Sequence, residues 1–236
     1  MDNETAAGAK EAAGRAAVDA LVKSGMRLGL GTGSTAIHAI RRVGELLSCG
    51  ALADIRAFAT SFQAAIECEK LRIPVYSLNS PELSGSLDLS IDGADEVDPQ
   101  NRLIKGGGGA LLIEKLAAYN SAAYAITVDE SKIVYTLGTA FPIPIEVVPE
   151  ARVTAGGALK KLGADVTLRE AVKKAGPVIT EHGNLILDIR FASPVDPAEM
   201  EREINQIPGV VENGLFTRIR PMVFIAYSGG TVKERS

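Results

Sequence analysis

The sequence predicts an α/β protein with a doubly wound, mostly parallel sheet and an inserted, smaller α+β domain. Three observations support this fold class. Short apolar runs alternate with amphipathic stretches as far as Asp129. The rhythm then changes near Tyr135, where Pro142, Pro144 and Pro149 punctuate an extended stretch. A last apolar run, at residues 222–227, is left over after the second pattern ends.

The first part of the chain alternates between helix and strand. Residues 5–23 carry Ala, Val and Leu on one helical face, and Gly25 ends this helix. Strands are then expected at 26–30, 55–60, 73–78, 87–91 and 124–129, and helices at 36–47, 62–71 and 110–119. This alternation favours a Rossmann-like parallel sheet with helices packed against it.

The second part follows the order strand, helix, strand, strand, helix, strand. These elements are expected at 143–148, 153–162, 165–168, 184–191, 197–206 and 210–216. The order is typical of a split, ferredoxin-like unit. The leftover strand at 222–227 indicates that the chain then returns to the first sheet. We therefore expect a larger α/β domain at 1–135 plus 222–236 and a smaller ferredoxin-like domain at 136–221.

Composition and charge exclude several classes of protein. The 236 residues are 46% hydrophobic and 23% charged, as in an ordinary globular protein, and the net charge of −4 argues against a nucleic-acid binder. The acidic, alanine-rich start is unlike a signal peptide, and no apolar run reaches the roughly 18 residues of a membrane span. Cys49 and Cys68 form no CxxC pair, which indicates reduced thiols and a cytoplasmic protein.

A glycine-rich loop, GLGTGSTA at residues 29–36, joins the first expected strand to the next helix. Glycines let the backbone approach a ligand, and the helix start offers unpaired N–H groups to an anion. Thr32, Ser34 and Thr35 add hydroxyls. The loop fits a relaxed dinucleotide fingerprint, but the second strand ends in Thr60 and Ser61 without the usual acid. A glycine-rich turn without a ligand stays an alternative.

A second segment, SIDGADEVDPQNRLIKGGGGALLIEK at residues 90–115, gathers acids, a lysine and four glycines. Four consecutive glycines are costly to order, and a plain turn needs only one or two. We expect their amides to face an oxyanion, with Lys105 as the nearby cation. Acids, a cation and exposed amides are the groups that move protons on an anionic substrate.

The acids of this segment have competing interpretations. Asp92 and Asp95 lie just past a strand end, where ligands bind in open α/β sheets, but an Asp- and Gly-rich turn also reverses a chain. Glu114 lies about one turn into the following helix, and the sequence does not decide whether it points toward the loop or into water. Leu112, Ile113 and Leu116 are expected to face the core.

Three other polar residues have plain structural interpretations. Asp129 is expected at most to cap the turn into Ser131. His38 lies among apolar residues of a helix and is expected to be packed, and His182 lies in a turn. Two distant histidines without an HxH or HExxH motif predict no transition-metal site. No cofactor is expected.

Four motifs in order resemble ribose-5-phosphate isomerase of the type-A family: GLGTGSTA, SIDGADEVD, LIKGGGGALLIEK and DESK at 129–132. The later stretches FPIPIEVVP, NLILDI and INQIPGVVENGLF are similar to that family too, so the resemblance runs from about residue 10 to about residue 232. It implies interconversion of ribose 5-phosphate and ribulose 5-phosphate through an enediolate, without metal, by a homodimer or homotetramer.

The resemblance also implies roles for individual residues. Glu114 would be the base that moves a proton between C1 and C2, with Asp92 and Lys105 as further catalytic groups. The substrate-binding residues would be Thr32, Gly33, Ser34, Thr35, Asp92, Gly93, Ala94, Asp95, Lys105, Gly106, Gly107, Gly108 and Lys132. Lys10 matches a family lysine near the phosphate only loosely, and Gly109 stands where the family often has Ala.

Three alternatives remain open at this level. A non-catalytic sugar-phosphate sensor on the same fold would keep the anion loops and need no base. A nicotinamide-dependent oxidoreductase would use the first glycine loop for a dinucleotide. A coenzyme A transferase, related in fold, would use a glutamate to form a thioester.

Overall fold

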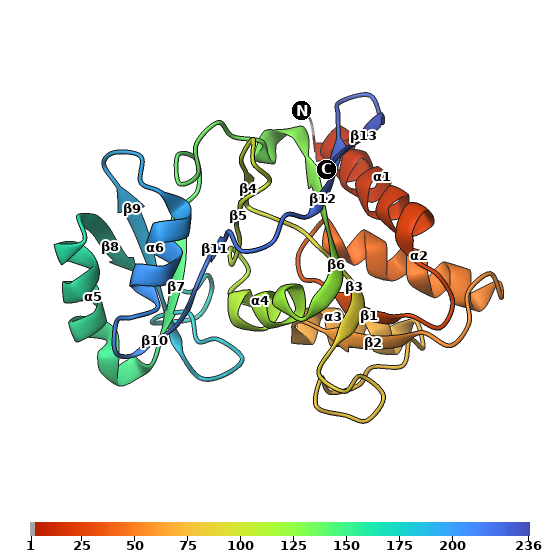
Figure 1. The fold of residues 1–236 in the computed structure, drawn as a ribbon, viewed down its shortest axis with the longest axis horizontal. Coiled ribbons are helices and arrows are strands. Elements are labelled where there is room, and N and C mark those ends of the chain that lie inside the picture. Colours follow the sequence, from red (N-terminus) through yellow and green to blue (C-terminus); the bar gives the residue numbers. More distant parts are fainter. Residues whose placement is uncertain (1–2) are drawn as a thin grey trace. The chain divides into compact units, whose positions relative to one another are not determined.

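The computed structural model describes residues 3–236, and the chain forms two compact units (Figure 1). The first unit comprises Met1–Ala94, Ile113–Lys132 and Ile219–Ser236. The second comprises Asp95–Leu112 and Ile133–Arg218. The chain therefore passes from one unit to the other inside the glycine- and acid-rich segment, at 94/95 and again at 112/113. The domain boundaries expected from the sequence stay a prediction.

The first unit is built on a six-stranded sheet, which confirms the predicted fold class. Its strands are β1 (Arg27–Leu30), β2 (Arg56–Ala59), β3 (Leu87–Asp92), β6 (Ser121–Asp129), β12 (Met222–Ala226) and β13 (Val232–Arg235). They lie in the order β13-β12-β6-β3-β1-β2, and only β13 is antiparallel to its neighbour. The strand expected at 222–227 thus returns to the first sheet, beside β6.

Two elements of this unit differ from those expected: β13 was not predicted, and the strand expected at 73–78 does not form. Only Val75 makes a bridge, to Ala57 of β2. Pro74 has no N–H to donate to a ladder, which confines it to the edge of a sheet. Tyr76 then leads directly into the turns that precede β3.

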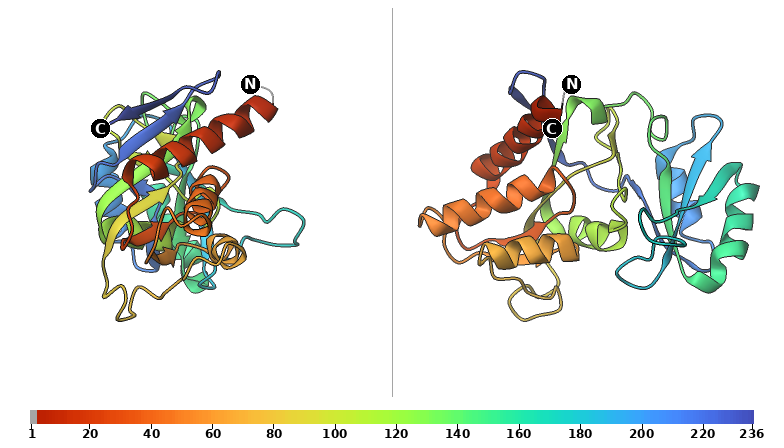
Figure 2. Two further views of the ribbon diagram at one scale, coloured as in Figure 1. Left: turned by 90° about the vertical axis from the view of Figure 1, so that its right-hand side faces the viewer. Right: turned by 180° about the vertical axis from the view of Figure 1, so that it is seen from behind.

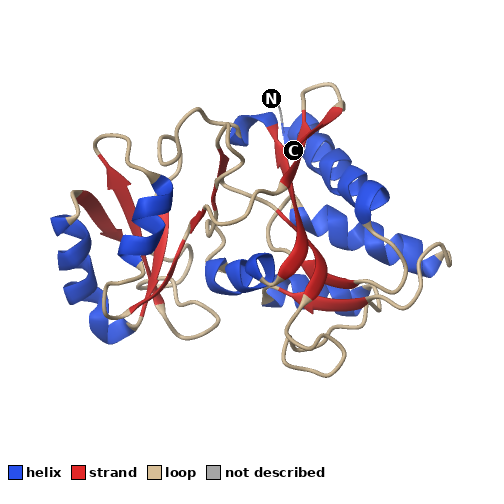
Figure 3. Ribbon diagram, viewed as in Figure 1, coloured by secondary structure: helices blue, strands red, loops and turns tan. Residues whose placement is uncertain are grey.

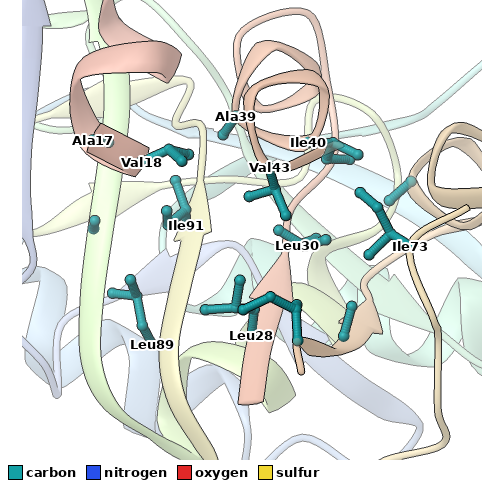
Figure 4. Packing of buried hydrophobic residues seen from close by; sticks show 14 of the residues in the cluster. Ala17, Val18, Leu28, Leu30, Ala39, Ile40, Val43, Ile73, Leu89 and Ile91 are labelled. Carbon is teal, nitrogen blue, oxygen red and sulfur yellow. The ribbon is translucent and has the colours of Figure 1, made fainter. Parts of the chain in front are cut away.

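Helices α1 (Asn3–Leu21), α2 (Ala36–Ser48) and α3 (Phe62–Lys70) cover one face of this sheet. Helices α1 and α2 lie side by side (Figures 1 and 2). The buried residues of α2, namely Ala36, Ala39, Ile40, Val43 and Gly44, follow the helical period. Of these, Ala39, Ile40 and Val43 pack with Leu28, Leu30, Leu89 and Ile91 of the strands (Figure 4). Helix α4 (Leu111–Tyr119) packs through Ala117 against Leu78, Leu83 and Leu87.

The second unit contains a four-stranded antiparallel sheet (strands are red in Figure 3). It consists of β7 (Ile143–Val147), β8 (Ala164–Leu168), β9 (Leu185–Phe191) and β10 (Val210–Asn213), in the order β10-β7-β9-β8. Helices α5 (Arg152–Lys161) and α6 (Pro197–Ile204) contribute Ala155, Leu159 and Ile204 to the core of this sheet. The element order and pairing are those of the predicted split, ferredoxin-like unit.

A small sheet in the second unit was not predicted. It joins β4 (Glu96–Val97), β5 (Leu103–Ile104) and β11 (Leu215–Phe216). The single strand expected at 210–216 is divided at Gly214, where the chain leaves one sheet for the other. The Gly214 N–H donates to the Pro144 carbonyl (2.7 Å), and a Cβ on Gly214 would lie 2.4 Å from the carbonyl oxygen of Lys105. Only glycine allows this approach.

Two short 3₁₀ turns complete the described elements: η1 (Glu130–Lys132) and η2 (Pro149–Ala151). None of the helices within residues 3–236 is long and apolar enough to cross a membrane.

A buried glutamate fixes one loop of the second unit. Glu96 is fully buried, and its carboxylate accepts three backbone N–H groups, from Gly138, Ala140 and Phe141, each at 2.6 Å. A carboxylate that is removed from water is stable when it is hydrogen-bonded in this way. Glu96 therefore holds the loop at 138–141, whose amides are not part of a described helix or strand.

We predict that Glu96→Ala lowers the free energy of unfolding by at least about 3 kcal/mol, because three amides lose a charged acceptor. Urea denaturation measures this change. The control is Glu203→Ala, at an exposed position of α6, which should change stability by no more than about 0.5 kcal/mol. Equal stability of the two variants would show that the Glu96 bonds do not stabilise the fold.

Candidate active site

The carboxylate of Asp92 lies at the end of β3 and binds the backbone of two loops. Asp92 is 2% exposed. Its Oδ1 atom accepts the N–H of Thr32 at 3.0 Å and the N–H of Gly93 at 2.7 Å. Asp92 thus joins the first glycine loop to the DGAD segment within the first unit, and the structure brings these two predicted segments together.

Gly31 permits this contact. A Cβ on Gly31 would lie 2.1 Å from Oδ1 and 2.6 Å from Cα of Asp92, far inside van der Waals contact. Its N–H donates to the Ile91 carbonyl at 3.0 Å. The requirement for glycine here is therefore a close approach to the neighbouring strand and not a turn.

The contact lies at the point where the sheet order reverses. From β1 the chain moves to β2 on one side, and then to β3 on the other. Ligands of open α/β sheets bind at the carboxyl ends of the strands at such a switch point. β1 and β3 are parallel, so Thr32 and Asp92 lie at the same edge of the sheet. The η1 turn with Lys132 follows β6 at this edge as well.

Side-chain contacts hold the first glycine loop. The Thr32 hydroxyl donates to the Ser61 hydroxyl at 2.6 Å and shares a hydrogen bond with Thr60 at 2.8 Å. Gly33 has a φ of 106°, which favours glycine, and its N–H donates to the Gln63 side chain at 2.9 Å. Thr60 and Ser61, which stand where a dinucleotide site would have an acid, are thus used to hold the loop.

Lysine 10 reaches this loop from helix α1. Its Nζ atom donates to the Ser34 hydroxyl at 3.1 Å. Thr35 precedes α2 without a side-chain cap, so the start of this 13-residue helix presents its amides. A lysine, hydroxyls and a helix N-terminus together suit a phosphate. The sequence placed Lys10 only by a loose match.

Glutamate 114 is buried. It lies in the first turn of α4, and 4% of it is exposed. The sequence did not decide the direction of Glu114. The expectation that Leu116 faces the core is wrong, because Leu116 is 42% exposed. Water is excluded from a carboxylate buried at a helix start.

Tyr124 is a buried tyrosine whose phenol is affected by the charges of both Glu114 and Asp92. It pairs with Ser90 in the register of β3 and β6, so its ring projects from the same face of the sheet as Asp92. Tyr124 is 5% exposed. Burial raises its pKa well above the usual value, and the charges of Asp92 and Glu114 raise it further. Both carboxylates therefore act on one phenol. Sequence reasoning missed Tyr124, because it reads as an ordinary strand residue.

A second group of predicted residues lies in the second unit. Asp95 accepts the Gly107 N–H at 2.7 Å. Lys105 is 2% exposed, and its Nζ lies 5.7 Å from the ring centre of Phe216, within range of a cation–π interaction. Gly106 has a φ of 103°. The Gly107 amide, expected to face an oxyanion, is thus bonded to Asp95, whereas Gly106 and Gly108 offer amides without a hydrogen bond to other described residues.

Several other acids of these segments hold loops and turns. Besides Glu96, Asp98 is fully buried and accepts the amides of Gln100 and Arg102 at 2.9 Å, so it holds a turn. Asp129 accepts the N–H and the hydroxyl of Ser131, which confirms it as a cap. Asp92 and Asp95, which contact the two glycine loops, remain the candidate site acids of this segment.

The other predicted residues have fewer contacts. No hydrogen bond or ion pair among residues 3–236 joins Lys132 to another predicted site residue. His38 is half-buried on α2, where burial and the nearby Arg41 lower its pKa. Among the described residues, His, Cys, Asp and Glu form no group of three that could hold a metal ion.

Comparison with known proteins decides the family. A family model described as ribose 5-phosphate isomerase A (phosphoriboisomerase A) matches residues 56–230. A ribose-5-phosphate isomerase A from Treponema pallidum is 55% identical over 226 residues, which cover 93% of this chain and 89% of that protein. The chain belongs to the ribose-5-phosphate isomerase A family. It is an aldose–ketose isomerase that acts on ribose 5-phosphate.

Solved structures of this family have the same fold. Ribose 5-phosphate isomerase A from Methanocaldococcus jannaschii has a TM-score of 0.90 at 41% identity, over 97% of this chain and 98% of that chain. A D-ribose-5-phosphate isomerase solved with phospho-erythronic acid has a TM-score of 0.91 at 40% identity, over 97% of each chain. The family resemblance and the fold class predicted from the sequence are confirmed.

We predict that Gly31→Ala lowers kcat/KM by about 100-fold, because the added methyl group displaces the Asp92 carboxylate by an ångström or more. Steady-state kinetics and a melting curve of the same preparation measure it. Gly8→Ala on α1, where a Cβ meets nothing within 4 Å, is the control and should keep full activity. A folded Gly31→Ala enzyme with unchanged kcat/KM would contradict the importance of this contact.

Proposed function

We propose that Glu114 is the base of the isomerisation. In the open-chain aldose its carboxylate removes the proton from C2, which leaves an enediolate, and the same group returns the proton to C1 to give the ketose. Electrons only move within the substrate, so no hydride acceptor is needed. The observation that supports this role most directly is the burial of Glu114 at the start of α4. Its charge and that of Asp92 both raise the pKa of Tyr124.

Asp92 is proposed to carry the proton between O1 and O2. Its Oδ1 atom accepts the amides of Thr32 and Gly93, which hold the carboxylate at the end of β3. A carboxylate held in place in this way can exchange a proton with hydroxyl groups of the substrate that lie within hydrogen-bond reach. This role is separate from that of the base, which acts on carbon.

Lys105 and the glycine loop are proposed to stabilise the negative charge of the enediolate, and Asp95 to position the sugar. A buried ammonium and backbone amides held before the reaction are typical groups for this purpose. Chain continuity favours action on the same substrate, since Asp95 follows Asp92 by three residues and Glu114 follows Gly108 by six. Gly93, Ala94 and Gly106 would contribute backbone contacts.

The phosphate is proposed to bind the first loop. The groups that suit it are the amides of residues 34–36, the Ser34 and Thr35 hydroxyls and Lys10, with Lys132 as a further cation. The reaction would serve the non-oxidative pentose phosphate pathway, in the cytoplasm and in a homodimer or homotetramer. The two free thiols and the family membership support this setting.

We predict that Glu114→Gln lowers kcat for ribose 5-phosphate by at least about 100-fold while it binds the substrate nearly normally, because only the base is removed. Stopped assays for ketose and calorimetric titration measure the two quantities. Glu69→Gln, at an exposed site of α3, is the matched control and should behave as the wild type. Phospho-erythronic acid, whose carboxylate adds a charge near the reacting carbons, should compete with ribose 5-phosphate in all three proteins.

Two outcomes would contradict this assignment. Full turnover by Glu114→Gln would remove Glu114 from the chemistry. A wild-type protein that binds ribose 5-phosphate but forms no ketose would instead be a sugar-phosphate sensor, which is the second function compatible with the two loops.

We further predict that exhaustive treatment with a chelator leaves kcat unchanged, because a carboxylate base and an ammonium can supply the proton transfer and the charge stabilisation. Metal analysis of the treated protein checks the removal. Lost activity that a divalent ion restores would contradict this mechanism.

A further inference from the structure

Arg169 contacts the glycine loop from a distant part of the second unit. It follows the last residue of β8, and its backbone is held on both sides: its N–H donates to Ile186, and its carbonyl accepts from Val178, each at 2.9 Å. Its guanidinium Nη1 donates to the carbonyl of Gly106 at 2.8 Å and to the carbonyl of Gly107 at 3.1 Å. None of the sequence motifs includes Arg169.

Asp188 fixes the orientation of this guanidinium. It lies on β9, and its two carboxylate oxygens accept Nε at 2.7 Å and Nη2 of Arg169. The Arg169 side chain is 14% exposed and that of Asp188 is 19% exposed. A bidentate pair of this kind is geometrically rigid, and the planar fork leaves Nη1 free to bind two acceptors at once. A lysine could not make all four contacts.

The two carbonyl contacts determine where the amides of the loop point. A trans peptide group is planar, and its C=O and N–H point in opposite directions. Since Arg169 binds the carbonyls of Gly106 and Gly107, the N–H groups of the same peptides, those of Gly107 and Gly108, point away from Arg169. The hydrogen bond from the Gly107 N–H to Asp95, at 2.7 Å, agrees with this direction. The peptide between Gly106 and Gly107 is therefore held at both ends.

We propose that Arg169 is a positioning residue of the isomerase, which orients and polarises the Gly108 amide for the enediolate oxygen and keeps the Gly107 amide on Asp95. Glycines have the largest conformational freedom of any residue, so a loop of four would otherwise fluctuate. Electrostatic stabilisation of a transition state requires donors that are held in place beforehand. A cation at a carbonyl also strengthens the donor at the other end of the same peptide. This proposal rests on the proposed role of the loop.

The variant Arg169→Met tests this proposal with ribose 5-phosphate as the substrate. We expect kcat to fall by about 10-fold or more, less than the roughly 100-fold loss of a whole donor. KM should change by less than about threefold, because the ground state of the sugar carries no charge on that oxygen. Hydrogen exchange of residues 105–111 should accelerate. Arg169→Lys, which keeps the charge and one donor, should recover part of kcat.

A matched control lies on the neighbouring strand. Arg190 of β9 makes only a 3.4 Å contact with the Ala140 carbonyl, away from the glycine loop. Arg190→Met should retain the kcat and the exchange rates of the wild type. If Arg169→Met fails to fold, Asp188→Asn replaces it, because this change keeps Arg169 but weakens its orientation, and it should lower kcat in the same direction.

The result that overturns the proposal is a kcat within twofold of the wild type in folded Arg169→Met, or in Asp188→Asn where the first variant does not fold. A fall in melting temperature together with proportional changes in kcat and KM would also overturn it, since that pattern indicates general loosening. Failure of the proposed base is a separate result: Glu114→Gln would then keep turnover, whatever the response of Arg169→Met.

Discussion

The hydrogen bonds from the Thr32 and Gly93 amides to one oxygen of Asp92 are the interaction that holds the candidate residues of the first unit together. They are possible because Gly31 has no Cβ, so that the end of β3 can occupy the space that a Cβ would fill. They hold the first glycine loop and the end of β3 at one edge of the parallel sheet. The remaining predicted residues of this unit are then placed by the strands and helices that begin or end there.

Residues of one chemical type have different roles because their hydrogen-bond partners differ. Glu96 and Asp98 are as deeply buried as Asp92, but the amides they accept belong to a structural loop and a turn, whereas Asp92 accepts the amides of Thr32 and Gly93. Asp95 binds the Gly107 amide and is only half-buried. Glu114 differs from all of these because it lies on a helix, whose first turn holds it in a defined direction.

Much of the fold could be predicted because it depends on local patterns. The periodicity of α2 and the apolar runs of β1 and β3 were enough to recover the doubly wound sheet. The prediction of a strand at 73–78 was wrong because Pro74 has no N–H to donate to a ladder, although the residues around it are apolar. The division of 210–216 into two strands was not predicted, because it depends on the contact of Gly214 with Lys105, which lies more than a hundred residues earlier in the chain. Such contacts leave no periodic signal.

The candidate site shows the same limit. Glycines and acids mark the loops in the sequence, but the burial of Glu114 and the exposure of Leu116 depend on how α4 is rotated, which its nine residues alone do not fix. Tyr124 and Arg169 carry no motif, and only the register of β6 and the end of β8 bring them to the carboxylates and to the glycine loop, respectively.

The most direct test of the central claim, that one carboxylate on α4 moves the proton between C2 and C1, is NMR of the substrate hydrogens in D₂O. With ribose 5-phosphate bound at saturation, the wild type should place deuterium at C1 of the ketose, partly diluted by hydrogen carried over from C2. The Glu114→Gln protein should show the bound sugar with both positions unexchanged. Deuterium entering at the wild-type rate in that variant would contradict the account.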